Sequence, residues 1–214
     1  MGIAMKIKIC GIRREEDVWM LNESMPDYAG FVFADTRRKV TAEQALKLRQ
    51  QLDRKIPVFG VFVNAPLSVV CDRVRDGCID AVQLHGDETE RYIRELRGQV
   101  SVPVVKAVRV RRAEDITEAD RLSCDFLLLD TFSPDQYGGT GRTFCWDIIP
   151  ESLSHPFFLA GGLSEQNIQE AMEHVNCFGV DVSGGVETEG VKDPVKIKRM
   201  VEMVHQHHNI AEWR

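Results

Sequence analysis

The sequence predicts an α/β fold, a single (βα)8 TIM barrel with eight parallel strands and outer helices. Eight short segments are apolar almost throughout, amphipathic stretches lie between them, and polar or glycine residues end almost every apolar run. Strands that are apolar on both faces are typical of parallel sheets covered by helices. Eight such strands with crossovers favour closure into a barrel, with an open doubly wound sheet as the alternative.

The expected strands are short and rich in β-branched or aromatic residues, which suit a buried pleated surface. They are Lys6–Cys10, Tyr28–Phe33, Pro57–Val63, Ala81–Leu84, Pro103–Val110, Phe126–Asp130, Phe157–Ala160 and Gly179–Val182.

Amphipathic segments between these strands predict the outer helices. Thr41 is the expected N-cap of a helix that carries Ala and Leu at helical spacing. The loop Thr131–Phe144 holds three glycines and one proline, and loops of this length in compact domains tend to be functional. Helices are expected within residues 13–24, 41–55, 64–77, 87–98, 111–123, 164–175 and 193–208.

The composition is that of an ordinary globular protein. The 214 residues fit one domain spanning 1–214, and 43% of them are hydrophobic, enough for a substantial core. A formal charge of −6 gives no basic footprint for nucleic acid, so local groups must hold any anionic ligand. No apolar run approaches the roughly 20 residues of a membrane span, and we expect no membrane partner.

Six cysteines are scattered without a Cys-x-x-Cys pair. In a chain of this length, such scattering indicates reduced thiols and a cytoplasmic location. The composition leaves both a monomer and a homodimer open.

The ends of the last two expected strands indicate a phosphate site. They read LAGGL and DVSGGVE, which place Gly161, Gly162, Ser183 and Gly184 at the barrel mouth. Glycines let backbone N–H groups approach an anion, and these barrels bind phosphate after strands seven and eight. The alternative is that the glycines only make tight turns.

Two reactive side chains also end strands. Cys10 closes the first strand beside a glycine, where the surroundings can lower its pKa and make a reactive thiol; a buried structural thiol is the alternative. Asp130 follows four apolar residues, and desolvation beside an anionic substrate suits it to general-acid chemistry. A helix-capping role is its alternative.

The histidines predict no metal site. His85 is a ligand group, an orienting donor or a cap, and no other histidine or carboxylate stands at metal-ligand spacing from it. The terminal group of His205, His207 and His208 is interpreted as a solvated helix end, with opportunistic binding of transition metals as the alternative.

Eight motifs follow one another along nearly the whole chain. They are KICGI at 8–12, GFVF at 30–33, GVFVN at 60–64, QLHGDE at 83–88, LLLDT at 127–131, GGTGRTFCW at 138–146, LAGGL at 159–163 and VDVSGGVE at 180–187. In this ordered combination the chain resembles the phosphoribosylanthranilate isomerase family, which acts in tryptophan biosynthesis.

The resemblance implies an Amadori rearrangement of N-(5′-phosphoribosyl)anthranilate without cofactor or metal. Cys10 would remove the C2′ proton and Asp130 would protonate the furanose oxygen. Arg38 would pair with the anthranilate carboxylate, with its neighbour Arg37 as the alternative if the register slips by one. The remaining implied positions are His85, Asp181, Gly139 and Thr140 toward the substrate, and Gly161, Gly162, Ser183 and Gly184 around the phosphate.

Two residues depart from the family pattern. Cys145 stands where an Asp is usual, which removes an expected N-cap of the sixth helix, at a cost of about 1 kcal/mol. Gly184 replaces the second Ser of the usual DVSSGVE and removes a hydroxyl donor toward phosphate.

Two other functions are weighed against this one. A ribulose-phosphate epimerase needs His and Asp metal ligands at several strand ends, which this sequence lacks. A catalytically silent phosphosugar-binding barrel needs neither Cys10 nor Asp130.

Overall fold

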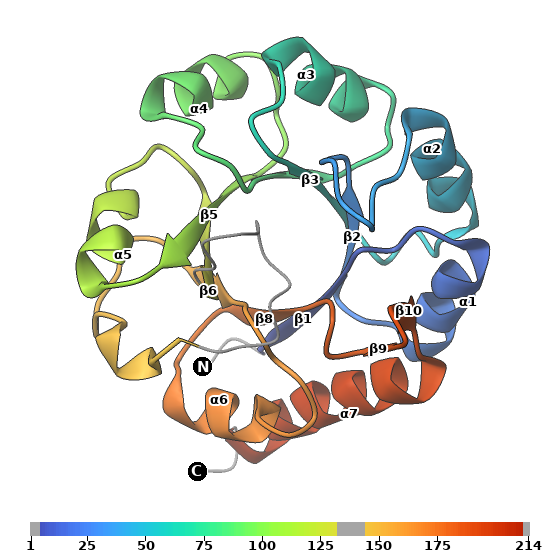
Figure 1. The fold of residues 1–214 in the computed structure, drawn as a ribbon, viewed down its shortest axis with the longest axis vertical. Helices are drawn as coiled ribbons and strands as arrows, with labels where there is room; N and C mark the ends of the chain where they lie inside the picture. Colours follow the sequence, from blue (N-terminus) through green and yellow to red (C-terminus); the bar gives the residue numbers. More distant parts are fainter. Residues whose placement is uncertain (1–4, 132–143, 212–214) are drawn as a thin grey trace.

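The computed structural model describes residues 5–131 and 144–211, with side chains through His207. Its eight long strands form a closed ring of parallel neighbours in chain order, with helices around the outside (Figure 1). The ring closes where β1 (Lys6–Cys10) pairs with β8 (Gly179–Val182). The expected barrel is confirmed, and the open-sheet alternative is wrong.

All eight expected strands are present, and their ends agree within one residue. The starts of two strands move to the residue after Pro57 and Pro103, because proline has no N–H to donate to a neighbouring strand. The remaining strands are β2 (Tyr28–Val32), β3 (Val58–Phe62), β4 (Ala81–Leu84), β5 (Val104–Val110), β6 (Phe126–Thr131) and β7 (Phe157–Leu159).

Each expected helical segment contains an α-helix. Thr41 caps its helix as expected: its hydroxyl accepts from the Gln44 N–H at 3.2 Å, and the Gln44 side chain accepts from the Thr41 N–H at 2.8 Å. The helices are α1 (Glu15–Ser24), α2 (Ala42–Gln51), α3 (Leu67–Arg75), α4 (Glu90–Arg97), α5 (Ala113–Ala119), α6 (Ile168–His174) and α7 (Pro194–Ala211).

Two elements differ from the expectation. From residue 144 onward, the crossover between β6 and β7 holds the 3₁₀ turn η1 (Trp146–Ile148) and no α-helix. Cys145 precedes η1, and its side chain makes no cap hydrogen bond, so the expected loss of a helix cap has no α-helix to act on. A small hairpin after β8, which the sequence did not predict, is made of β9 (Glu187–Thr188) and β10 (Val191–Lys192).

The core has an outer and an inner part. The larger cluster packs strands against helices, as in any helix-covered sheet. A second cluster, with Phe59, Val105, Leu128 and Phe158 among its members, lies inside the ring. The rings of Phe59 and Phe158 meet edge to face with centroids 5.7 Å apart, a favoured aromatic geometry. The interior is not wholly apolar, because Lys8 in β1, Gln83 in β4 and Lys106 in β5 are also buried.

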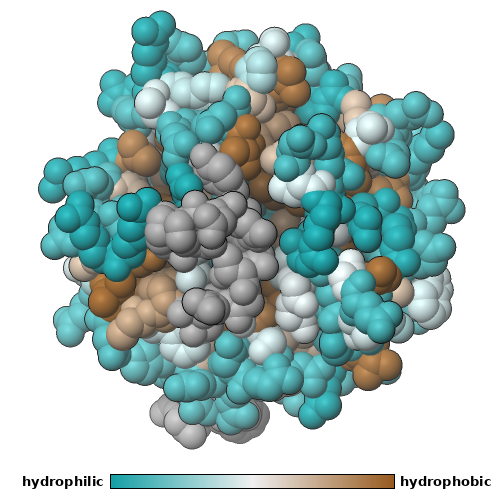
Figure 2. All heavy atoms as spheres, in the orientation of Figure 1, coloured by the Kyte–Doolittle hydropathy of each residue, from teal (hydrophilic) through white to brown (hydrophobic). Residues whose placement is uncertain are grey.

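Among the described residues, no helix combines the length and the apolar character that crossing a membrane requires. Figure 2 shows hydrophilic side chains over much of the outer helices, with hydrophobic patches between them.

Candidate functional site

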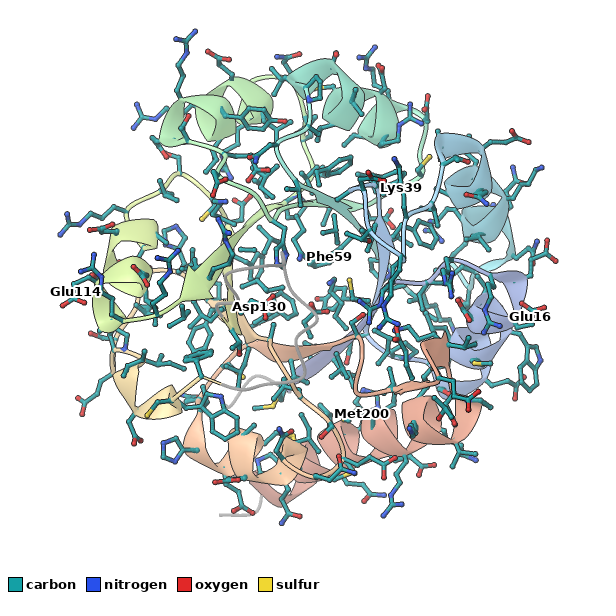
Figure 3. The ribbon with its side chains drawn as sticks, in the orientation of Figure 1. Glu16, Lys39, Phe59, Glu114, Asp130 and Met200 are labelled. Carbon is teal, nitrogen blue, oxygen red and sulfur yellow. The ribbon has the colours of Figure 1, made fainter. Side chains whose placement is uncertain are left out.

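The C-terminal ends of the strands converge at one mouth of the barrel. β1 ends at Cys10, β6 carries Asp130 as its penultimate residue, and His85 directly follows β4. All three side chains are buried. Figure 3 shows Asp130 on the inner side of the ring. The structure thus brings the three sequence-predicted residues to the same end of the barrel, the end that carries active sites in this fold.

Asp130 is tied into a short chain of hydrogen bonds. His85 Nε2 lies 3.2 Å from Asp130 Oδ2, and the Thr131 backbone N–H donates to Asp130 Oδ1 at 2.8 Å. On the other side of the imidazole, Gln83 Nε2 lies 2.9 Å from His85 Nδ1. If the Gln83 amide donates to Nδ1, the ring proton sits on Nε2 and points at Asp130. These contacts tie Asp130 to His85 and to the Thr131 backbone, and none of them is a helix cap.

Cys10 sits in a tight pocket at the end of β1. It clusters with Val32 and Val61, and a Cβ added to Gly30 would come within 2.8 Å of its sulfur. Burial raises the pKa of the Cys10 thiol, and the positive charge of Lys8 lowers it by less. The surroundings therefore do not give the net lowering of this pKa that the sequence suggested.

Arg38 belongs to the loop after β2, and its side chain reaches residues that follow β1 and β8 at the mouth. A Cβ added to Gly11 would overlap the Arg38 side chain, so the glycine makes room for it. The guanidinium donates to both oxygens of Glu187, from Nε at 2.7 Å and from Nη2 at 3.0 Å. Arg37 also reaches Glu187, at 2.7 Å, but its side chain is 57% exposed against 13% for Arg38. Arg38, not Arg37, is the arginine packed at the mouth.

Glu187 joins Arg38 to a second buried cation. Lys192 Nζ lies 3.1 Å from Glu187 Oε1 and donates to the Ser183 carbonyl at 2.9 Å. Although burial acts to raise it, hydrogen bonds and charges from Arg38 and Lys192 hold the pKa of Glu187 to about 2. The carboxylate thus stays ionised and fixes the orientation of the Arg38 fork.

The glycines after β7 and β8 form two adjoining turns. Gly161 and Gly162 have φ of +86° and +65°, and a Cβ on Gly161 would overlap Thr131. A bridge from Ser164 to Gly185 joins the two turns, and a Cβ on Gly185 would overlap the Leu163 carbonyl.

The residues of the β8 turn differ in their need for glycine. At Gly184 the nearest described atom to an added Cβ is Arg38 Nη2, at 3.6 Å, so the described part of the chain leaves room for a side chain there. Ser183 Oγ donates to the Cys10 carbonyl at 3.0 Å. The backbone therefore requires glycine at Gly185, and the departure at Gly184 is not forced by lack of space.

Four site residues were missed by sequence reasoning: Lys8, Gln83, Glu187 and Lys192. A signal existed for two of them, because Lys8 and Gln83 are polar residues two positions before Cys10 and His85 in otherwise apolar strands. Residues two apart on a strand share a face. Glu187 and Lys192 belong to the hairpin that the sequence did not predict.

Asp181, Gly139 and Thr140 are the other residues expected to face the substrate. Gly139 and Thr140 lie outside the described residues. Asp181 lies on β8 with its carboxylate on Lys8, at 2.8 Å. No group of three or more His, Cys, Asp or Glu side chains that could hold a metal ion occurs within residues 5–131 and 144–207.

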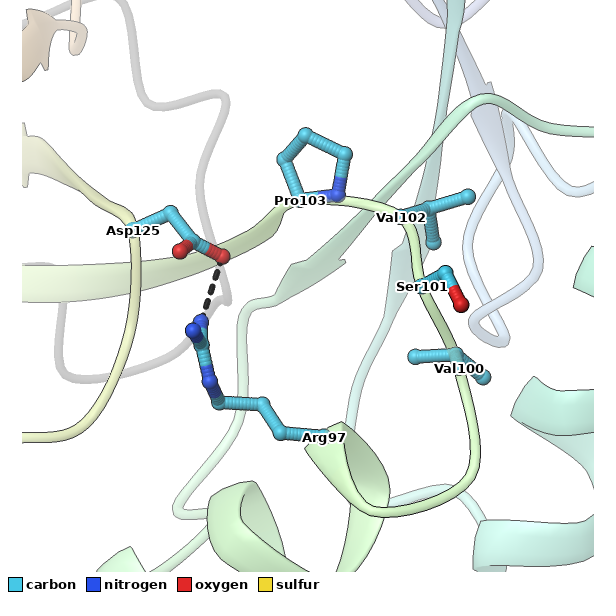
Figure 4. A pocket seen from close by; sticks show the side chains of 6 residues that line it. All are labelled: Arg97, Val100, Ser101, Val102, Pro103 and Asp125. Carbon is cyan, nitrogen blue, oxygen red and sulfur yellow. Dashed lines mark hydrogen bonds and ion pairs between the residues drawn. The ribbon is translucent and has the colours of Figure 1, made fainter.

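A surface hollow of about 260 Å³ lies at the opposite end of the barrel (Figure 4). It is bounded by Pro103 and Asp125, which precede β5 and β6, and by the Arg97 side chain, which donates to Asp125 at 2.6 Å. Because active sites in this fold lie at the C-terminal ends of the strands, this hollow is not part of the site.

Comparisons with known proteins agree with this geometry. The family model described as N-(5′-phosphoribosyl)anthranilate (PRA) isomerase matches residues 7–203. A protein of Endomicrobium trichonymphae named N-(5′-phosphoribosyl)anthranilate isomerase is 48% identical over 199 residues, covering 93% of this chain and 98% of the relative.

Solved structures agree as well. A phosphoribosyl anthranilate isomerase in complex with reduced 1-(o-carboxyphenylamino)-1-deoxyribulose 5-phosphate is similar, with a TM-score of 0.77, 31% identity and coverage of 95% of this chain and 99% of the other. Monomers generated from the dimeric enzyme of Thermotoga maritima give a TM-score of 0.78 at 32% identity and the same coverage. Since the family model spans almost the entire barrel and a full-length relative shares nearly half of its residues, this chain belongs to the N-(5′-phosphoribosyl)anthranilate isomerase family.

Proposed function

We propose that this isomerase of tryptophan biosynthesis rearranges N-(5′-phosphoribosyl)anthranilate to 1-(2-carboxyphenylamino)-1-deoxyribulose 5-phosphate, with Cys10 as general base and Asp130 as general acid. The observation that carries the proposal is the arrangement of two buried reactive groups at one mouth, each with its own polar partner. Asp130 contacts His85, and Cys10 shares a face of β1 with the buried cation Lys8. A silent phosphosugar-binding barrel would need neither pair.

The chemistry is an internal transfer of protons. Asp130 gives a proton to the furanose oxygen as the C1′–O bond breaks, and the nitrogen lone pair forms the C1′=N bond of a Schiff base. Cys10, as thiolate, takes the C2′ proton, and the C2′–H electrons move toward the nitrogen to give an enolamine. Tautomerisation places a proton on C1′ and leaves a ketone at C2′. No oxidant, reductant or cofactor enters this balance.

Arg38 is proposed to receive the anthranilate carboxylate. A guanidinium is planar and suits this planar anion, and Glu187 holds it in a fixed orientation at the mouth. His85 orients Asp130 from the other side of the mouth. Gly139 and Thr140, which lie outside the described residues, are proposed to bind the substrate.

The phosphate is proposed to bind the turns after β7 and β8. The members of this set are Gly161, Gly162, Ser183 and Gly184. Gly161 and Gly162 expose backbone in conformations that side chains disfavour, which suits close approach of an anion. Nucleic acid is not a proposed partner, since the net charge is −6.

We further propose that residues 1–214 act as one cytoplasmic domain, as a monomer or a homodimer. All six cysteines are free thiols, which supports a reducing compartment. A relative described as dimeric makes a homodimer reasonable. Light scattering of the purified protein would distinguish the two states.

The test mixes purified protein with phosphoribosylanthranilate and measures the rate at which the fluorescence of the substrate is lost. We expect turnover by the unaltered chain and a loss of at least about 10²-fold in Cys10→Ser and in Asp130→Asn, the scale for removal of a general base or acid. Circular dichroism would show that both variants fold. Near-normal rates in either variant would overturn its assigned role.

A further inference from the structure

Lys8 is a fully buried cation inside the barrel. Its side chain is 0% exposed, and its Nζ lies 2.8 Å from Asp181 Oδ1. The same nitrogen stands 5.5 Å from the centroid of the Phe59 ring, a member of the inner apolar cluster. A charge in such a place costs free energy unless something pairs with it. Asp181, directly opposite Lys8 in the register of β1 and β8, is that partner.

Lys8 and Cys10 share one side of β1. The two residues are two positions apart on the strand, so their side chains point to the same face, and the positive charge of Lys8 acts on the Cys10 thiol. Cys10 is otherwise surrounded by apolar groups from β2 and β3, namely Val32 and Val61. A thiolate in that pocket needs a nearby cation.

Three charged groups act on Cys10. Burial raises its pKa, Lys8 lowers it, Asp181 raises it and Lys192, on β10, lowers it. Lys8 itself stays protonated: burial acts to lower its pKa, but Asp181 and Cys10 raise it further, so the net direction is upward.

We propose that Lys8 is a positioning residue that holds the Cys10 sulfur in place and stabilises its thiolate, and that Asp181 acts on Cys10 through Lys8. The inference rests on the proposed role of Cys10 as base. It gives Asp181 a different part from the direct contact with substrate that the family resemblance implied. Because Lys8 and Asp181 carry opposite charges, removing one should shift the pKa of the Cys10 thiol in the opposite direction from removing the other.

The first test measures the thiol itself. A thiolate absorbs ultraviolet light more strongly than a thiol does. The difference in absorbance between each protein and its Cys10→Ser counterpart therefore isolates the titration of Cys10. We expect Lys8→Met to raise the titration midpoint by about one pH unit or more, the scale for an adjacent charge, and Asp181→Asn to lower it. Lys6→Met is the matched control, because Lys6 also pairs with an aspartate, Asp27 at 2.8 Å, but lies four residues from Cys10.

A midpoint in Lys8→Met equal to that of the unaltered protein would overturn the proposal, as would an equal shift in Lys6→Met. Loss of one partner from a buried ion pair is costly, so Lys8→Met must first be shown to fold. Should it fail to fold, Asp181→Asn decides alone: a lower midpoint supports the proposal, and an unchanged or higher one overturns it.

The second test is the pH profile of kcat/KM, whose acid limb reports the base of the free enzyme. We expect that limb to move to higher pH in Lys8→Met. A purely structural loss would lower the plateau and leave the limb in place. If Cys10→Ser keeps normal turnover, the proposed base is wrong, yet the thiol titration still tests the link between Lys8 and Cys10.

Discussion

His85 and Asp130 face each other across a buried contact of 3.2 Å, and the position of the imidazole is fixed from its far side by Gln83. The Gln83 Oε1 atom is buried and has no partner among the described residues, so the contact of Nε2 with the imidazole is the hydrogen bond that the structure shows for this side chain. Gln83 therefore influences Asp130 without touching it.

Gln83→Leu should weaken catalysis while the fold survives. Without a donor at Nδ1, the imidazole can place its proton there and turn an unprotonated Nε2 toward the Asp130 carboxylate, which weakens the contact. We expect kcat/KM to fall about tenfold, the value of one lost hydrogen bond. Gln99→Leu, at an exposed residue just beyond α4, is the matched control in the same steady-state assay. Equal rates for both variants would contradict the role of Gln83.

Arg38→Ala should act mainly on substrate binding. The side chain is nearly buried at the mouth and oriented by Glu187, whereas Arg37 is largely in solvent. We expect KM to rise at least about tenfold in Arg38→Ala, because a charged hydrogen-bonding group is lost. Arg37→Ala is the control, with a change of less than about twofold expected for an exposed ion pair. The opposite order would mean that the carboxylate binds Arg37.

The fold was predictable because each strand is an apolar run with a sharp polar or glycine end. β1 and β4 agree to the residue, and Cys10, His85 and Asp130 follow from the rule that the strand ends share one mouth. The pairing of polar side chains inside the ring was harder to predict from the sequence. Lys8 breaks an apolar strand, but only the register with Asp181 on β8 shows how its charge is paired.

The hairpin β9–β10 escaped prediction for a physical reason. Each of its strands has two residues, too few for the alternation of apolar and polar side chains to show. Its pairing comes from a turn at Glu189 and Gly190, both with positive φ. The Arg38–Glu187–Lys192 network depends on this hairpin, so no pattern in the sequence indicated which groups hold Arg38.

Acidification should release part of the stability of the barrel through Glu187. Its pKa is about 2 in the folded chain against an ordinary value of 4.5, so the folded state favours the ionised form. The stabilisation is complete above pH 4.5 and is lost as the pH falls toward 2, because the carboxylate then takes up a proton and releases Arg38 and Lys192.

Urea unfolding at a series of pH values checks this expectation. The free energy of unfolding should fall less steeply between pH 4.5 and 2 in Glu187→Gln than in the unaltered protein. Glu43→Gln is the control, because Glu43 pairs with Lys47 in solvent, where such pairs contribute little. An unchanged slope in Glu187→Gln would contradict the prediction.

The neighbouring glycines Gly184 and Gly185 should respond differently to a side chain. Among residues 5–131 and 144–207, an added Cβ at Gly184 meets only Arg38 Nη2 at 3.6 Å, so Gly184→Ser should fold normally and supply the hydroxyl of the usual family pattern. We expect its KM to fall by up to about tenfold, the value of one hydrogen bond to a charged phosphate.

In Gly185→Ala the new methyl group would overlap the Leu163 carbonyl and push apart the two turns joined by the Ser164–Gly185 bridge. That variant should lose about 1–3 kcal/mol of stability and bind substrate more weakly. Thermal unfolding and steady-state kinetics on the pair distinguish a missing donor from a required glycine, and a higher KM in Gly184→Ser would mean that the phosphate does not bind beside this turn.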